Sequence, residues 1–316
     1  MIVPMPPARL LGPLLFCILF TIGCGATESA EMIEHAPINL ADGELLQVVA
    51  STSIVADVVD QVGGDHIELV SLMPAGTDPH GFQPTPSDLI AIGEAHAIFI
   101  NGLHLEESLE PVLTSSDNHS PIVAVNDGVQ TIELGESAHG ENVDPHTWFS
   151  IRAVEQWVEN IQQALSKLDP ANGERYKTNA QAYLTELDVL RTELDGLIAE
   201  LAMDKRKLVT NHDSFGYFAA EYDFNLVGTI IPSLSTMASP TAGELAALQD
   251  QIEVEEVPAI FVGAVVNPGL AEQLAADMNI QVVTLYTGAL SNSTGPANNY
   301  VDFMRYNVTM IVEALK

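Results

Sequence analysis

The chain has 316 residues, of which 47% are hydrophobic, so it is long enough to bury one large core or two medium ones. Its 43 acidic residues against 11 lysines and arginines give a formal net charge of -32. This charge repels phosphate backbones and anionic membranes, which makes nucleic acid a poor partner. An acidic surface also concentrates cations around the molecule, although such a surface most often serves only solubility.

The first 23 residues have the composition of an export signal. Arg9 is their only charged residue, and an apolar run follows at positions 10–22. A membrane span needs about 20 apolar residues, so this shorter run fits a signal peptide. The run ends in a glycine and Cys24, which resembles the cleavage site of bacterial lipoproteins. We therefore predict a lipoprotein-type signal peptide over residues 1–23, with lipidation of Cys24. Because Thr21 departs from the usual leucine, an ordinary signal peptide with a chance cysteine is the alternative.

The next segment, residues 24–44, is small, polar and acidic, and we predict a flexible tether there. The lipid on Cys24 would then anchor the chain to a membrane through this tether. The expected location is the bacterial cell envelope, either on the outer side of the cytoplasmic membrane or in the periplasm.

From residue 45 onward, short β-branched runs alternate with amphipathic segments, a pattern typical of βαβ units and a parallel sheet. In the first half the pattern predicts strands at 46–50, 67–72, 97–100 and 122–125, and helices at 54–62 and 87–94. In the second half it predicts strands at 208–210, 225–229, 259–262 and 281–285, and helices at 215–221, 242–252 and 270–278. The fold class is therefore α/β, with two similar lobes over residues 45–168 and 205–316.

A long helix is predicted between the two lobes, in residues 169–204. Apolar residues recur there in steps of four and three from Tyr176 to Leu201, while Asp169 can cap the helix and Pro170 can occupy its first turn. A helix of about 30 residues is about 45 Å long. A coiled coil shows the same stripe, but this segment is not repeated and lies between two α/β halves. We therefore expect one helix that packs across both lobes.

Three of the nine histidines stand in a setting that suits a metal ligand. His80 and His146 each follow Asp-Pro, where proline fixes φ and the aspartate can accept hydrogen bonds from nearby N–H groups. His212 directly follows the predicted strand 208–210, at the edge where parallel sheets place their ligand sites. The spacing leaves two interpretations open, a shared metal site and three unrelated loop histidines. The other six histidines have no neighbouring residues in the sequence that suggest a metal ligand: His35, His66, His96, His104, His119 and His139.

Seven motifs occur in a characteristic order along the chain: PAGTDPH from Pro74, PTPSD from Pro84, NGLHLE from Asn101, DPHTW from Asp144, HDSFGYF from His212, VNPGLA from Val266 and LYTGAL from Leu285. With these motifs the chain resembles the zinc- and manganese-binding solute-binding lipoproteins of ABC importers, the family of ZnuA, TroA and PsaA. The resemblance implies two lobes, each with a four-stranded parallel sheet flanked by helices, joined by one long helix. It also implies a metal in the cleft, with His80 and His146 as ligands from the first lobe and His212 from the second.

The fourth ligand of the family does not transfer to this chain. Many relatives carry an aspartate where this sequence has Gly288. Water, chloride or a loop carboxylate such as Asp213 or Glu141 could fill the fourth position. Three imidazoles favour Zn²⁺, since Mn²⁺ prefers oxygen donors. Zinc-selective relatives often have a long His-rich loop where only residues 137–142 remain, which weakens this assignment. The expected cargo is therefore Zn²⁺, with Mn²⁺ as the alternative.

The implied function is capture of a divalent metal ion and its delivery to an ABC transporter permease, by a monomer that is not an enzyme. Metal binding should weaken below about pH 6, since free histidine titrates near 6.5. One alternative is an adhesin-like or degenerate binding protein, because the family aspartate is missing. Another is a zinc hydrolase or lyase, since three histidines and an open position also describe a catalytic zinc, but the sequence offers no recognisable general base.

Overall fold

Two four-stranded parallel sheets form the framework of the chain in the computed structural model, which describes residues 36–41, 43–115, 119–133 and 143–316. The first has the order β2-β1-β3-β4, and the second has the same spatial order, β6-β5-β7-β8. The first sheet comprises β1 (Leu46–Thr52), β2 (Ile67–Met73), β3 (Ala97–Ile100) and β4 (Ile122–Ala124), and the second comprises β5 (Lys207–His212), β6 (Asn225–Ile231), β7 (Ala259–Gly263) and β8 (Gln281–Leu285). The predicted α/β class and the two similar halves are confirmed.

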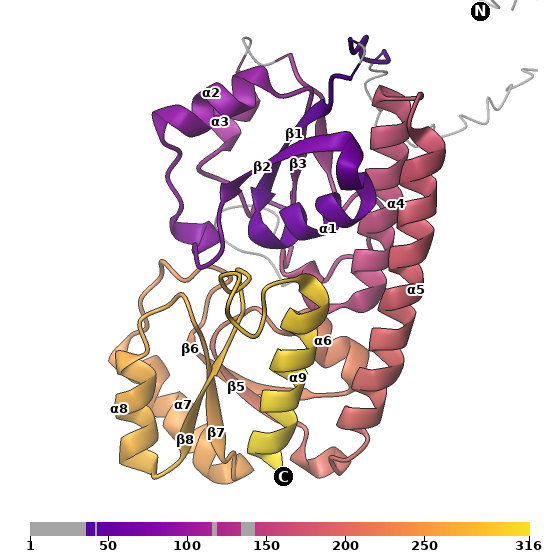
Figure 1. The fold of residues 1–316 in the computed structure, drawn as a ribbon. Coiled ribbons are helices and arrows are strands. Elements are labelled where there is room, and N and C mark those ends of the chain that lie inside the picture. Colours follow the sequence, from indigo (N-terminus) through magenta and orange to yellow (C-terminus); the bar gives the residue numbers. More distant parts are fainter. Residues whose placement is uncertain (1–35, 42, 116–118, 134–142) are drawn as a thin grey trace, which may run out of the picture. The chain divides into compact units, whose positions relative to one another are not determined.

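Each sheet is flanked by helices within the compact unit that begins at residue 35 (Figure 1). The first half contains α1 (Ser53–Gly63), α2 (Pro86–Glu94) and the short α3 (Glu110–Leu113), and the second contains α6 (Gly216–Tyr222), α7 (Ala242–Glu255), α8 (Gly269–Met278) and α9 (Tyr300–Leu315). Thr85 starts α2 and Thr241 starts α7, each through a capping box with the acidic residue three positions later. No helix in the described ranges is long and apolar enough to cross a membrane.

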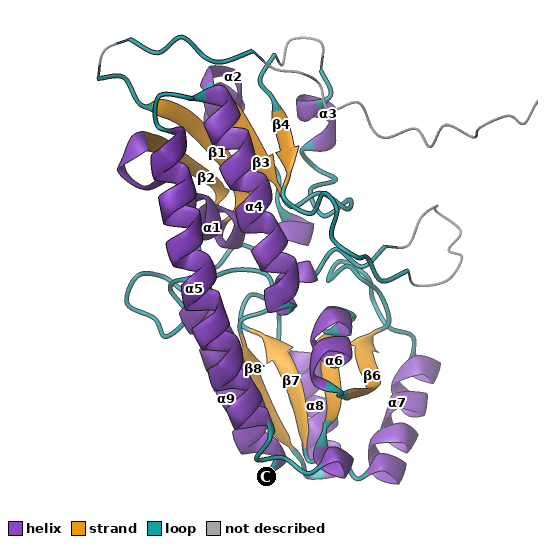
Figure 2. Cartoon of the chain, turned by 90° about the vertical axis from the view of Figure 1, so that its right-hand side faces the viewer, coloured by secondary structure: helices purple, strands orange, loops and turns teal. Residues whose placement is uncertain are grey.

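The linking helix is α5 (Gly173–Ile198), with 26 residues, and it is preceded by α4 (Ile151–Leu168). Helix α5 runs beside both sheets and packs against α1 and α4 of the first half and against α9 of the second half (Figure 2). Its predicted apolar stripe is buried, from Tyr176 to Leu194. The start of the helix differs from the prediction, because Asp169 caps the end of α4 and accepts a hydrogen bond from the Tyr176 hydroxyl at 2.8 Å.

One apolar cluster runs through both halves and joins them. It contains residues of α1, α4, α5 and α9 together with the inner faces of the two sheets. Two smaller clusters lie on the outer faces, one beneath α7 and α8 and the other beneath α2 and α3. Because the large cluster is continuous from one lobe to the other, we expect the lobes to move relative to each other by small shifts and not by a wide hinge.

The predicted export signal and Cys24 lie outside the described residues, as does most of the predicted tether. Of its described residues, 36–41 lie on the first lobe: the Ile38 N–H donates to the Leu168 carbonyl at 2.8 Å, and Ile38 and Leu40 pack against the large apolar cluster. These residues contain no helix or strand.

Candidate metal centre

His80, His146 and His212 come together from three separate segments of the chain. His80 lies in a single 3₁₀ turn (Pro79–Gly81) after β2, His146 directly precedes another (Thr147–Phe149), and His212 is the last residue of β5. One potential ligand atom from each side chain lies within 4.8 Å of those of the other two. The Nε2 atoms of His80 and His146 are 3.2 Å apart. Within the described ranges, no other group of three or more His, Cys, Asp or Glu side chains is this close.

The two Asp-Pro-His motifs form the same local turn. Asp78 Oδ1 accepts a hydrogen bond from the His80 N–H at 3.1 Å, and Asp144 Oδ1 accepts one from the His146 N–H at 2.9 Å. The prediction that each aspartate holds nearby backbone N–H groups is therefore confirmed. Asp144 Oδ1 also lies 2.7 Å from His146 Nδ1, which leaves Nε2 of that ring facing the other two imidazoles.

Burial keeps the imidazoles of His80 and His212 neutral. His146 is 1% exposed and His212 is 3% exposed, while His80 is partly buried. Burial, with a smaller contribution from the neighbouring His146, lowers the pKa of His80 to about 3. The pKa of His212 lies well below its usual range, mainly because of burial and then because of His146 and His80. Neutral imidazole is the form that binds a metal ion, so both rings are ready to coordinate without losing a proton.

A buried polar frame holds the backbone on both sides of His146. The Asn101 side-chain amide donates to the Pro145 carbonyl at 3.1 Å, and the Thr147 hydroxyl donates to Asn126 Oδ1 at 2.6 Å. The Asn126 amide in turn donates to the Asn101 carbonyl at 2.9 Å. Because these groups are buried and bonded to one another, the frame fixes the position of His146 before any ligand arrives.

Glu106 anchors this frame from within the first lobe. Its carboxylate accepts hydrogen bonds from the Ser51 hydroxyl at 2.6 Å, the Asn101 N–H at 2.7 Å and the Gly102 N–H at 3.0 Å. Burial raises its pKa. The loop that it closes is tight, with φ of 80° at Gly102, 54° at Leu103 and 61° at His104. Glu106 is the last residue of the NGLHLE motif, but the sequence alone did not indicate that its carboxylate anchors the frame.

The other described histidines lie outside the three-histidine group. His96 Nδ1 accepts a hydrogen bond from the Gln47 N–H, His104 pairs with Glu110 at the surface, and His66 packs edge-on against Tyr176. His119 is also outside the group. His35 and His139 lie outside the described residues, as does Glu141, one of the two carboxylates considered for the fourth position.

Asp213, the other candidate for the fourth position, does not join the group either. Its N–H donates to the Ser233 carbonyl at 3.0 Å. Burial, together with the charge of Asp144, raises the pKa of its carboxyl. Among the described residues, no carboxylate therefore lies close enough to all three imidazoles to be a fourth member of the group.

Gly288 lies against the turn that carries His80. A Cβ atom at this position would come within 2.9 Å of Pro79 Cδ, closer than carbon atoms pack. The segment around Gly288 is also bound to the first lobe: the Trp148 indole donates to the Thr287 carbonyl at 2.8 Å, and the Leu290 N–H donates to the Ser53 hydroxyl at 3.0 Å. A side chain at position 288 would therefore have to displace the Pro79 ring.

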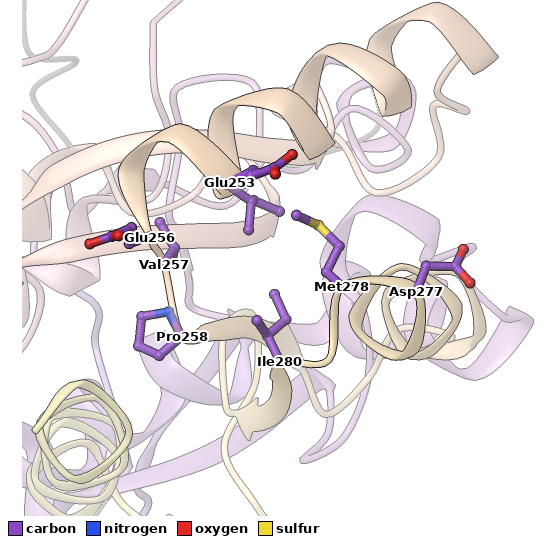
Figure 3. A pocket seen from close by; sticks show the side chains of 8 residues that line it. Glu253, Glu256, Val257, Pro258, Asp277, Met278 and Ile280 are labelled. Carbon is purple, nitrogen blue, oxygen red and sulfur yellow. The ribbon is translucent and has the colours of Figure 1, made fainter.

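A cavity of about 510 Å³ lies away from these histidines, between the C-terminal ends of α7 and α8 (Figure 3). Its lining combines apolar and acidic residues: Ile252, Glu253, Glu256, Val257, Pro258, Asp277, Met278 and Ile280. None of the three clustered histidines lines it, so it is not part of the candidate metal centre.

Comparison with known proteins gives consistent results. Residues 48–314 match the family model described as ZnuA, "Zinc-uptake complex component A periplasmic". The chain is 29% identical over 298 residues to the manganese-binding lipoprotein MntA of Halalkalibacterium halodurans, covering 94% of this chain and 95% of that protein. It is 30% identical over 313 residues to the manganese ABC transporter substrate-binding lipoprotein PsaA of Streptococcus pneumoniae, covering 96% and 98%. The periplasmic zinc-binding protein TroA of Treponema pallidum superposes with a TM-score of 0.80 at 28% identity, covering 86% of this chain and 99% of that one.

Proposed function

The chain belongs to the ZnuA family, whose members are substrate-binding components of metal ABC transporters and not enzymes, and from this premise we propose that it binds a divalent metal ion between His80, His146 and His212 and delivers it to the transporter's permease. The observation that carries the proposal is the convergence of three imidazole ligand atoms within 4.8 Å, two of them from the first lobe and one from the second. The metal is the cargo. Its bonds to both lobes would let a docked permease distinguish the loaded from the empty protein.

Elemental analysis after dialysis tests this function. The purified chain, dialysed against a few micromolar Zn²⁺ or Mn²⁺, is expected to retain one metal ion per chain. A chain that retains neither ion would be an adhesin-like or degenerate member of the family and would contradict the proposal.

We propose Zn²⁺ as the preferred cargo and Mn²⁺ as the alternative. The group consists of imidazoles alone, which suit Zn²⁺, whereas Mn²⁺ prefers carboxylate and water oxygens. The relatives named above support the alternative, because two of the three are named for manganese. Because no carboxylate of the described residues joins the group, we propose a ligand from solvent for the fourth position.

Substitution of Gly288 tests what selects the metal. Gly288→Asp places an oxygen donor next to the turn of His80, and we expect the ratio of Mn²⁺ to Zn²⁺ affinity to rise about tenfold. Gly288→Ala is the matched control, because it meets Pro79 in the same way but adds no donor, and it should weaken both metals alike. Competition titrations with a chelator measure both affinities. An equal ratio in the two variants would show that position 288 does not influence the choice of metal.

Proton release on metal binding should be small. The pKa of His80 is lowered to about 3, so this ring has no proton to lose between pH 5 and 6.5, and the lowered pKa of His212 favours its neutral form as well. Three free imidazoles would release up to about three protons in this range, whereas we expect about one or fewer. Zinc affinity should therefore fall less on acidification than the sequence alone suggested. Calorimetry in buffers with different ionisation enthalpies counts the protons, and a value near three would contradict the burial argument.

We also propose that the chain is anchored to the membrane through lipid on Cys24, as in the relatives named as lipoproteins. The full-length chain, expressed in bacteria, should then partition into the detergent phase of a Triton X-114 extract. Recovery in the aqueous phase, with Cys24 unmodified by mass spectrometry, would contradict the anchor.

A further inference from the structure

A single carboxylate connects the turn of His80 to the opposite lobe. Asp78 Oδ1 accepts the hydrogen bond from the His80 N–H, and its other oxygen, Oδ2, accepts one from the Thr236 hydroxyl at 2.6 Å. Thr236 lies in the loop between β6 and α7, 158 residues further along the chain. A hydrogen bond to a charged acceptor at this distance is one of the stronger kinds.

The same loop is fixed to the segment that follows His212. The Asp213 N–H donates to the Ser233 carbonyl at 3.0 Å, and the Ser235 N–H donates to the Ser233 hydroxyl at 3.1 Å. The next residue along the chain is Thr236. A short series of hydrogen bonds therefore runs from the residue after one candidate ligand, through the loop and Asp78, to the backbone of another.

His80 depends on such contacts more than the other two histidines do. His212 is held within β5, and His146 is held by the frame around Asn101 and Asn126, whereas His80 lies on a three-residue turn and is the most exposed of the group. That turn rests on the second lobe at successive positions. Pro79 lies against Gly288, and a Cβ at Gly81 would lie 3.4 Å from Met237 Sδ. Of the contacts at positions 78, 79 and 81, the one between Asp78 and Thr236 is a hydrogen bond.

We propose that Thr236 is a positioning residue that latches the His80 turn to the second lobe through Asp78 and thereby slows release of the bound metal. This inference rests on the function proposed above. A metal held by three imidazoles dissociates after one of them swings away, and the ligand on the loosest segment leaves first. The latch opposes that first step, so its loss should raise the dissociation rate and leave the association rate nearly unchanged.

The test compares two substitutions of nearly equal size. Thr236→Val removes the hydroxyl and keeps the shape of the side chain, whereas Thr236→Ser keeps the hydroxyl. Stopped-flow transfer of Zn²⁺ from the loaded protein to a chromophoric chelator gives the dissociation rate. We expect Thr236→Val to release zinc about tenfold faster than the wild type, the effect of one hydrogen bond to a charged group at a partly exposed site. Thr236→Ser should release zinc at the wild-type rate.

Two controls separate positioning from a general loss of stability. Thr185→Val removes an exposed hydroxyl on α5 that donates to the Gln181 carbonyl, and it should leave zinc release unchanged. The melting temperature of the metal-free Thr236→Val protein should stay within about 2 °C of the wild type, as for a surface substitution. The latch would be overturned if Thr236→Val released zinc at the wild-type rate, or if Thr236→Ser released it as fast as Thr236→Val. A wild-type chain that binds no metal would instead overturn the proposed function.

Discussion

Replacement of His212 by alanine is expected to weaken Zn²⁺ binding by about 100-fold or more, because it removes one of three nitrogen donors and the only one from the second lobe. The remaining pair, His80 and His146, lies on one lobe and could no longer tie the two lobes together. Competition titration of the metal-free protein against a zinc chelator measures the loss.

The control for this substitution is His104→Asn, because His104 has φ of 61°, a conformation that asparagine also adopts readily. His104 is an exposed histidine that pairs with Glu110 away from the group, and its loss should leave zinc affinity within about twofold of the wild type. Circular dichroism should show that both variants are folded. If His212→Ala bound zinc as tightly as His104→Asn, the three-histidine site would be wrong.

Replacement of Asp144 by asparagine should lower zinc affinity by about 10- to 100-fold, although Asp144 is not expected to touch the metal. The carboxylate lies 2.7 Å from His146 Nδ1 and is buried with it, so it holds the orientation of the ring and leaves Nε2 free for the metal. Asparagine has nearly the same shape, which matters because Gly216 of the second lobe packs closely on the other carboxylate oxygen. The effect should therefore come from the lost charge and not from a gap in packing.

Asp223→Asn provides the comparison for the loss of one negative charge. Asp223 is exposed at the end of α6 with φ of 57°, a conformation that asparagine also adopts readily. Its zinc affinity should match the wild type at 0.15 M salt, where exposed charges are screened. Equal affinities for Asp144→Asn and Asp223→Asn would mean that Asp144 has no role in holding His146.

The sheets could be predicted from the sequence because their signals are local. The β-branched runs of β1 and β8, for example, each stand next to one predicted helix, and the predicted strands agree with the observed ones to within about two residues at each end. The helices α4 and α9 were not predicted. Their apolar residues also recur in steps of three and four, as in Val154, Trp157, Val158 and Ile161 of α4, so the signal for these helices was present.

The candidate ligands could also be predicted, because His80 and His146 each lie in an Asp-Pro-His motif that builds its own turn and His212 lies at the carboxyl end of a strand. The contacts that surround them could not. The bond from Asn101 to Pro145 joins residues 44 positions apart, and the bond from Thr236 to Asp78 joins residues 158 apart. Such pairs depend on how loops from different strands meet at the edges of the two sheets, which no local pattern encodes. For the same reason the lowered pKa of His80 follows only from its burial in the folded chain.

Anomalous X-ray diffraction at the zinc absorption edge, on crystals of the zinc-loaded chain, tests the central claim most directly. The account predicts one strong anomalous peak per chain, about 2.0 to 2.1 Å from one ring nitrogen each of His80, His146 and His212, with a solvent ligand in the fourth position. A peak that lacks any one of these three histidines as a ligand, or no peak among them in crystals that contain zinc, would contradict it.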